Sequence, residues 1–225
     1  MSARARYLQL AVLVLAAGVI YPLVYLRQNF EVTLLEAFQI TNTQLGQCYS
    51  LLGVLFVLSY VPSGWLADRI QPRVLLTFSL FATGCLGLWY WTLPGFAALQ
   101  MIYAGWGITT GLTFWAALIK ETNLIAQHNE QGRFFGILEG GRGVVEALLG
   151  SIVVAWFAWS LANLDVSSAA ALQQIIGFYV AVLLVSAPLV WFALGGPDAN
   201  DTTALHGDQS QTGKGQLLTD ARAVR

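Results

Sequence analysis

The chain has 225 residues, of which 56% are hydrophobic and only 10% are charged, and its formal net charge is −1. One soluble domain of this size cannot hide so much apolar surface, so the composition predicts an all-α membrane protein. The near-zero net charge gives no basic surface for a nucleic acid. The sequence also lacks metal-ligand spacing, a phosphate-binding glycine loop and a nucleophile–base motif, so we expect neither an enzyme nor a metal or cofactor site.

Six apolar runs are long enough to cross a bilayer as helices. They cover residues 7–26, 45–67, 74–92, 97–119, 134–161 and 172–194. The first run follows Arg4 and Arg6, but it has no small-residue cleavage site and therefore predicts a helix rather than a signal peptide. We expect a six-helix membrane domain over residues 1–194 and a polar, disordered cytoplasmic tail over residues 195–225.

The connections between the runs alternate in character. Residues 29–44 contain two acidic residues and no Lys or Arg, and Thr41 or Asn42 is suited to cap the second helix. Leu93, Pro94 and Gly95 predict a turn on the same side of the membrane. These connections are the expected outer loops.

The segment 64–73, Gly-Trp-Leu-Ala-Asp-Arg-Ile-Gln-Pro-Arg, predicts a tight turn on the opposite side. Gly64 and Ala67 are small enough for close helix approach, and Asp68 is expected to end the second helix. Pro72 suits the first turn of the third helix.

The distribution of basic residues predicts the orientation. With six spans, most of them fall on one side, so both termini are expected in the cytoplasm. These residues are Arg4, Arg6, Arg69, Arg73, Lys120, Arg133, Lys214, Arg222 and Arg225. The two that remain are Arg27, at the outer end of the first span, and Arg142, inside the fifth.

Arg142 is the charge that the membrane tolerates least. An unpaired arginine at such a depth costs about 2.5 to 3.5 kcal/mol on insertion scales. Glu139 and Glu146 lie three residues before and four after it, so the three side chains share one helix face. Two interpretations stay open: a self-neutralising ion cluster, or a cavity wall in which Arg142 faces an anionic substrate and one glutamate carries a proton. Arg27 likewise is either an interfacial snorkelling residue or a ligand.

Glycines predict close helix packing in two spans. In the fifth span Gly132, Gly136 and Gly140 recur every four residues. In the fourth span the corresponding residues are Gly105, Gly107 and Gly111.

The turn at 64–73 carries a family resemblance. The pattern Gly64-x-Leu66-Ala67-Asp68-Arg69-x-x-x-Arg73, between the second and third spans, resembles the signature loop of the major facilitator superfamily. The six spans are similar to the N-terminal half of that fold. Gln71 and Pro72 replace the usual glycine and basic residue, and this variant resembles the organophosphate:phosphate antiporter branch.

The first span is similar to the same branch. Its stretch Tyr21-Pro-Leu-Val-Tyr25-Leu-Arg27-Gln-Asn29-Phe30 resembles a helix in which the arginine before x-Asn-Phe binds substrate phosphate. Arg142 aligns with a site histidine of the glycerol-phosphate carriers, whereas Tyr60 replaces a lysine of those carriers. The resemblance therefore implies an organic anion as substrate, either an organophosphate or a sugar acid.

The resemblance also implies a set of roles. The expected substrate-binding residues are Arg27, Arg142, Tyr21, Tyr25, Tyr60 and Glu139. Glu139 and Glu146 are expected to couple protons or to form ion pairs. The expected gating residues are Gly64, Asp68, Arg69 and Arg73, which in the family hold the cytoplasmic side closed.

A carrier of this superfamily has two six-helix halves that rock around a central substrate site, and the chain supplies one of them. A single half has three explanations: a truncated or split gene product, a homodimerising half-carrier, or a piece of a longer chain. We expect truncation. The expected partners are the lipid bilayer of a bacterial inner membrane, a small anionic substrate, and either a second six-helix half or a second copy. The alternatives are a non-transporting membrane sensor or interaction subunit, and an inactive remnant.

Overall fold

The computed structural model describes residues 2–127 and 129–195, and the secondary structure in these ranges is helical. The helices are α1 (Ala3–Val24), α2 (Arg27–Phe38), α3 (Asn42–Arg69), α4 (Pro72–Trp91), α5 (Phe96–Thr113), α6 (Trp115–Ile125), α7 (Gln131–Asn163) and α8 (Ser168–Ala193). Six stretches are long and apolar enough to cross a membrane, with α1–α2 and α5–α6 each forming one stretch. The prediction of an all-α protein with six spans is confirmed. The predicted tail lies outside the described residues, apart from Gly195.

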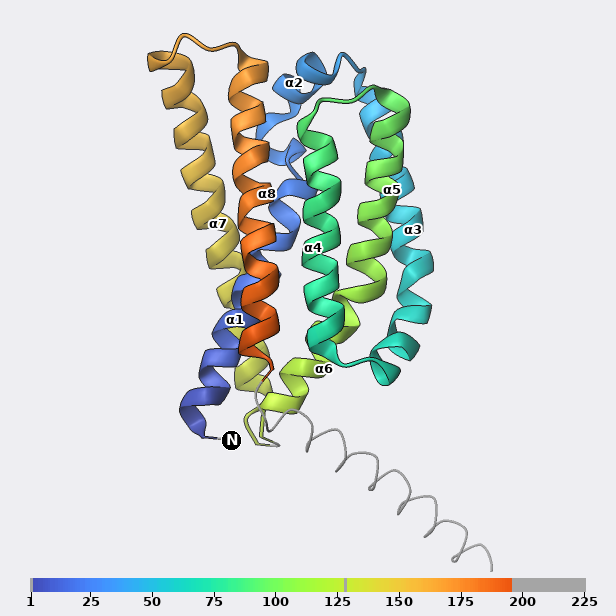
Figure 1. The fold of residues 1–225 in the computed structure, drawn as a ribbon, viewed down its shortest axis with the longest axis vertical. Coiled ribbons are helices and arrows are strands. Elements are labelled where there is room, and N and C mark those ends of the chain that lie inside the picture. Colours follow the sequence, from blue (N-terminus) through green and yellow to red (C-terminus); the bar gives the residue numbers. More distant parts are fainter. Residues whose placement is uncertain (1, 128, 196–225) are drawn as a thin grey trace, which may run out of the picture.

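The helices form an elongated bundle in which α3 packs on α5, α4 on α8, and α1 on α7 (Figure 1). α7 and α3 lie at opposite flanks of this view. The N-terminus, the α3–α4 turn, the α6–α7 connection and the end of α8 lie at one end of the bundle. The described basic residues on which the orientation depends belong to elements at that end: Arg4 and Arg6 to the start of α1, Arg69 and Arg73 to the ends of α3 and α4 at their turn, Lys120 to α6 and Arg133 to the start of α7. Which side of the membrane it faces stays a prediction.

The first outer connection is helical over most of its length, which the sequence did not predict. α2 continues to Phe38 after a break at Tyr25 and Leu26. Phe30, Leu34 and Phe38, spaced four residues apart, are its buried residues, and the ring of Phe38 lies 4.7 Å from that of Tyr90. An apolar stripe at helical spacing therefore packs α2 onto the bundle.

The predicted ends of α3 and α4 are largely correct. Thr41 caps α3 in a reciprocal capping box with Gln44, and Pro72 occupies the first turn of α4. α3 ends at Arg69, one residue later than expected. Lys120 of α6 donates a hydrogen bond to the Ala67 carbonyl, 2.6 Å away, and so satisfies one of the last carbonyls of α3.

The prediction that glycines allow close helix packing is correct for the fourth span and wrong for the fifth. Cβ atoms added at Gly107 and Gly111 would lie 2.5 Å and 3.0 Å from backbone oxygens of α3, so these glycines do allow α5 to approach α3. Added Cβ atoms at Gly132, Gly136, Gly140 and Gly64 would meet nothing within 4 Å. The expectation that Gly64 allows a close helix approach is therefore wrong as well.

The close contact between α1 and α7 uses two other glycines. A Cβ at Gly18 would lie 2.5 Å from Cβ of Val145, and a Cβ at Gly141 would lie 2.7 Å from Val14. This contact holds the Arg142 segment of α7 against the middle of α1.

Candidate functional site

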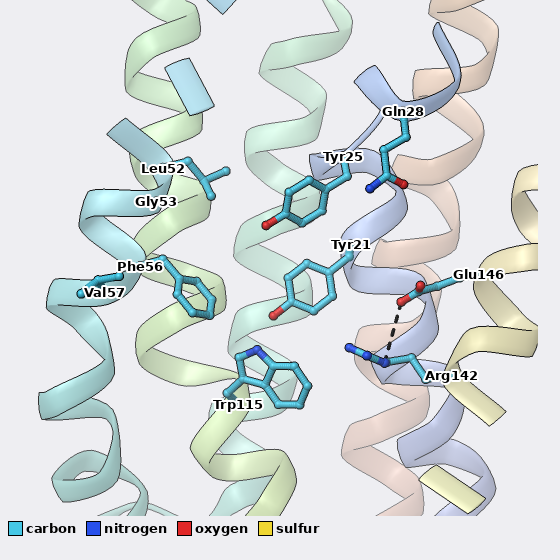
Figure 2. A pocket seen from close by; sticks show the side chains of 10 residues that line it. All are labelled: Tyr21, Tyr25, Gln28, Leu52, Gly53, Phe56, Val57, Trp115, Arg142 and Glu146. Carbon is cyan, nitrogen blue, oxygen red and sulfur yellow. Dashed lines mark ion pairs between the residues drawn. The ribbon is translucent and has the colours of Figure 1, made fainter. Parts of the chain in front are cut away.

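A cavity of about 440 Å³ opens between α1, α2, α3, α6 and α7. Its lining residues are Tyr21, Tyr25, Gln28, Leu52, Gly53, Phe56, Val57, Trp115, Arg142 and Glu146. Figure 2 shows the two tyrosine rings of the first span between the α3 side chains and the Arg142–Glu146 pair. The lining is mostly apolar and aromatic with a few polar groups, which is typical of a small-molecule site.

Arg142 makes the ionic contacts of this wall. Its NH2 lies 3.0 Å from Glu139 Oε2, and its Nε lies 3.9 Å from Glu146 Oε1. The guanidinium carbon stands 5.4 Å from the ring centroid of Trp115. The predicted sharing of one helix face by the three charged residues is confirmed.

Two polar atoms in the cavity wall have no hydrogen-bond partner among the described residues. They are Nε of Arg142 and the hydroxyl of Tyr21, and both are buried from solvent. A buried unpaired donor carries the full cost of its lost hydration, about 1 to 3 kcal/mol, so such groups call for a partner. Both atoms are suited to donate to an oxygen of a bound molecule.

Tyr25 lies at a break in the first span, and Tyr21 lies one helical turn before it in α1. Pro22 lies near the end of α1, the helix ends at Val24, and α2 begins at Arg27. In this break the Gln28 N–H bonds to the Tyr25 carbonyl, which leaves the Val24 carbonyl available. Tyr49 of α3 donates its hydroxyl to that carbonyl at 3.0 Å, and its ring stacks on Tyr25 with centroids 6.0 Å apart.

We expect Tyr49→Phe to destabilise the protein, because it leaves the Val24 carbonyl without its donor. The expected loss is about 1 kcal/mol of unfolding free energy. The midpoint of thermal unfolding in detergent measures it. Tyr7→Phe is the matched control, since the Tyr7 hydroxyl has no hydrogen bond to any described residue while its ring packs on Phe134. Equal midpoints for the two variants would contradict this assignment.

The structure brings together half of the predicted substrate residues. Tyr21, Tyr25 and Arg142 line the cavity, whereas Arg27, Tyr60 and Glu139 do not. Arg27 begins α2, pairs with Glu31 at 3.2 Å and donates to Asn42 Oδ1 at 3.4 Å. Tyr60 is exposed, one turn beyond Phe56. The roles of these six residues stay predictions.

Of the predicted proton-coupling pair, Glu146 lines the cavity and Glu139 lies outside it, with 49% of its side chain exposed. Sequence reasoning missed Gln28, Trp115 and the α3 residues Leu52, Gly53, Phe56 and Val57. Gln28 directly follows the predicted substrate residue Arg27, and this position was the signal in the sequence that could have identified it. Trp115 begins α6 after a break at Phe114, and the apolar run itself gave no sign of that break.

The predicted gating residues lie together at the α3–α4 turn. Arg69 stacks on Trp65 at 4.0 Å from the ring centroid, and Arg73 on Trp191 at 4.9 Å. Asp68 is exposed and makes no ion pair with any described residue. Within residues 2–127 and 129–195, no group of three or more His, Cys, Asp or Glu could hold a metal ion.

Comparison with known proteins agrees with this architecture. Residues 7–223 match the family model of the Major Facilitator Superfamily, and the chain belongs to that superfamily. This is a class of membrane transporters rather than of enzymes.

Two proteins of Escherichia coli strain K12 are similar to the chain. The inner membrane protein YqcE is 30% identical over 220 residues, which are 97% of this chain and 49% of YqcE. The inner membrane protein YihN is 30% identical over 184 residues, 82% of this chain and 42% of YihN. An uncharacterized protein of Mycoplasma pneumoniae is 29% identical over 90 residues, 40% of this chain and 69% of that protein. The chain thus spans about half the length of the two E. coli relatives.

Proposed function

We infer that the chain is one half of a secondary transporter that carries a small organic anion by alternating access, with Arg142 as the anion-binding group. The observation that carries this proposal is the cavity wall, where Arg142 Nε and the Tyr21 hydroxyl are buried and have no hydrogen bond to any described residue. An anion that accepts a hydrogen bond from Arg142 satisfies its Nε, and an arginine suits carboxylate and phosphate geometry.

The cavity supports a polar substrate with an apolar face. Its volume of about 440 Å³ is within the range of small-molecule sites. Tyr25, Phe56 and Trp115 offer aromatic surface for carbon–hydrogen groups, and Gln28 offers an amide for hydroxyls. An organophosphate, as in the branch that the first span resembles, and a sugar acid are the substrate classes to test.

The exposed apolar faces of α7 and α3 favour a partner for this half. Only 11% of the most apolar window of α7 and 22% of that of α3 are buried, against 56% in the first span. A second six-helix half, or a second copy of the chain, is proposed to cover these faces and to close the cavity. Asp68, Arg69 and Arg73 are proposed to latch the bundle end against it. The carboxylate of Asp68 supports that role, because it is exposed and forms no ion pair with any described residue.

For the cellular location, the names of YqcE and YihN support an inner membrane. The clustering of described basic residues at one end of the bundle supports a cytoplasmic N-terminus.

Counterflow tests the function. The protein, expressed from its own reading frame with any segment that continues it, is reconstituted into liposomes loaded with unlabelled gluconate or glycerol 3-phosphate. We expect labelled anion of the same kind to enter transiently above its external concentration. Saturable binding without counterflow would contradict transport and favour the sensor alternative.

A further inference from the structure

The cavity wall that holds Arg142 also holds a carboxylate. Arg142 and Glu146 both line the cavity. Arg142 Nε and Glu146 Oε1 are 3.9 Å apart, which is too far for a hydrogen bond, and Arg142 Nε has no hydrogen-bond partner among the described residues. A ligand that enters the cavity therefore meets a cationic and an anionic group side by side, and each of them has room for a closer partner.

The charge balance of this wall disfavours a ligand that carries negative charge alone. Glu139 lies 3.0 Å from the NH2 of Arg142, so one arginine faces two glutamates and the cluster has a net charge of −1. Among the described residues that line the cavity, Arg142 is the only cation. An anion that pairs with Arg142 makes the cluster more negative, and like charges repel one another more strongly in a low-dielectric site than in water. A positive charge on the ligand itself offsets this repulsion.

The remaining lining suits a positive charge. Four of the lining residues are aromatic: Tyr21, Tyr25, Phe56 and Trp115. Figure 2 shows these rings between the α3 ribbon and the Arg142–Glu146 pair. The face of an aromatic ring attracts a cation, and sets of such rings are used to bind quaternary ammonium groups. Arg142 already makes this kind of contact with Trp115, whose ring centroid lies 5.4 Å from the guanidinium carbon.

We propose that the substrate carries an ammonium group as well as an anionic group. Arg142 binds the anionic group, and Glu146 together with the four aromatic rings forms an ammonium subsite. This inference rests on the proposed function and narrows its substrate class to aminated organic anions, such as amino-alkyl phosphates and amino acids. Because Arg142 and Glu146 are neighbours in the wall, the two charges of the ligand are expected to lie only a few bonds apart.

Two pairs of probe ligands isolate the ammonium charge. Phosphocholine and 3,3-dimethylbutyl phosphate have the same shape, but a carbon atom replaces the ammonium nitrogen in the second. γ-Butyrobetaine and 5,5-dimethylhexanoate form the corresponding carboxylate pair. In titration calorimetry with the purified protein in detergent, we expect the ammonium member of at least one pair to bind about tenfold more tightly than its carbon analogue, the scale of one desolvated cation contact.

Glu146→Gln and Phe56→Leu test the ammonium subsite itself. Glu146→Gln keeps the size of the side chain and removes its charge, so we expect the preference for the ammonium ligand to fall about tenfold, while the carbon analogue binds at least as tightly as before. Phe56→Leu replaces a ring by an aliphatic side chain, so we expect it to weaken binding of the ammonium ligand and to leave that of the carbon analogue nearly unchanged. Thermal midpoints check that both variants fold.

Two further glutamate variants serve as controls. Glu139→Gln loosens the hold on Arg142 from outside the cavity, so it is expected to change the affinity for both members of a pair in the same direction and to keep their ratio. Glu36→Gln, at an exposed residue of α2 outside the cavity, is expected to change neither affinity. An equal loss of affinity for both ligands in a folded Glu146→Gln protein would mean a merely structural role for Glu146 and would contradict the ammonium subsite.

Counterflow with the same ligands separates this inference from the proposed function. If the ammonium ligands bind preferentially but neither they nor gluconate or glycerol 3-phosphate exchange, transport fails and the ammonium subsite stands as a binding site. If the carbon analogues bind as tightly as the ammonium ligands, if no ammonium ligand binds, or if Glu146→Gln keeps the full preference, the ammonium subsite is overturned. Exchange of gluconate or glycerol 3-phosphate in that case leaves the proposed function intact.

Discussion

Arg142→Ala is expected to abolish anion counterflow, with a loss of anion affinity on the order of 100-fold or more. Removing one member of a buried, hydrogen-bonded charge pair costs about 2 to 5 kcal/mol, and each 1.4 kcal/mol is a factor of ten in affinity. The variant also leaves Glu146 in the cavity wall without its cation, so the wall repels an anion.

The measurement is labelled-anion binding and counterflow, with thermal unfolding as the check on folding. Arg133→Ala is the matched control on the same helix, because Arg133 contacts the Tyr7 ring and lies outside the cavity. Arg142→Lys keeps the charge but loses the bidentate geometry, so an intermediate affinity is expected. Counterflow that survives unchanged in a folded Arg142→Ala protein would remove Arg142 from the site.

Gly107→Ala is expected to destabilise the protein by about 1 to 3 kcal/mol, the usual cost of forcing a methyl group into a packed contact. The added Cβ would lie 2.5 Å from the Leu52 carbonyl oxygen and 3.2 Å from the Leu52 Cα. Because these are backbone atoms of α3, relief requires the two helices to separate. Leu52 and Gly53 also line the cavity, so anion affinity is expected to fall as well.

Gly136→Ala is the control for this substitution. Nothing lies within 4 Å of a Cβ at Gly136, and alanine favours a helix over glycine by about 1 kcal/mol. Its thermal midpoint in detergent is therefore expected to equal or exceed that of the unmodified protein. A Gly107→Ala protein with an unchanged midpoint would contradict the close α3–α5 contact.

The membrane spans and the local features at helix ends could be predicted well from the sequence. Each membrane span is a property of about 20 consecutive residues, and the cap at Thr41 and the proline at position 72 depend only on their neighbours. The sharing of one face by Glu139, Arg142 and Glu146 follows from helical spacing alone, and the ion pairs confirm it.

Packing between distant segments could not be predicted in the same way. The regular stripe of Gly132, Gly136 and Gly140 indicated a contact face, yet Gly18 and Gly141 make the contact between α1 and α7. Small residues permit close approach on any face, and only the neighbouring helix decides which face is used. Arg27, for which the resemblance implied substrate binding, lies outside the cavity, while Gln28 lines it.

By itself, then, the sequence determined the class of protein, the number of spans, the turn that carries the family signature, and a charged cluster on one helix face. These features arise from residues close together in the chain. The tertiary structure alone decided that Tyr21, Trp115 and Arg142 enclose one cavity and that Glu146, rather than Glu139, faces it. That choice depends on how α7 is rotated against α1, which is set by side-chain volumes more than 100 residues apart in the chain, at Gly18 and Val145.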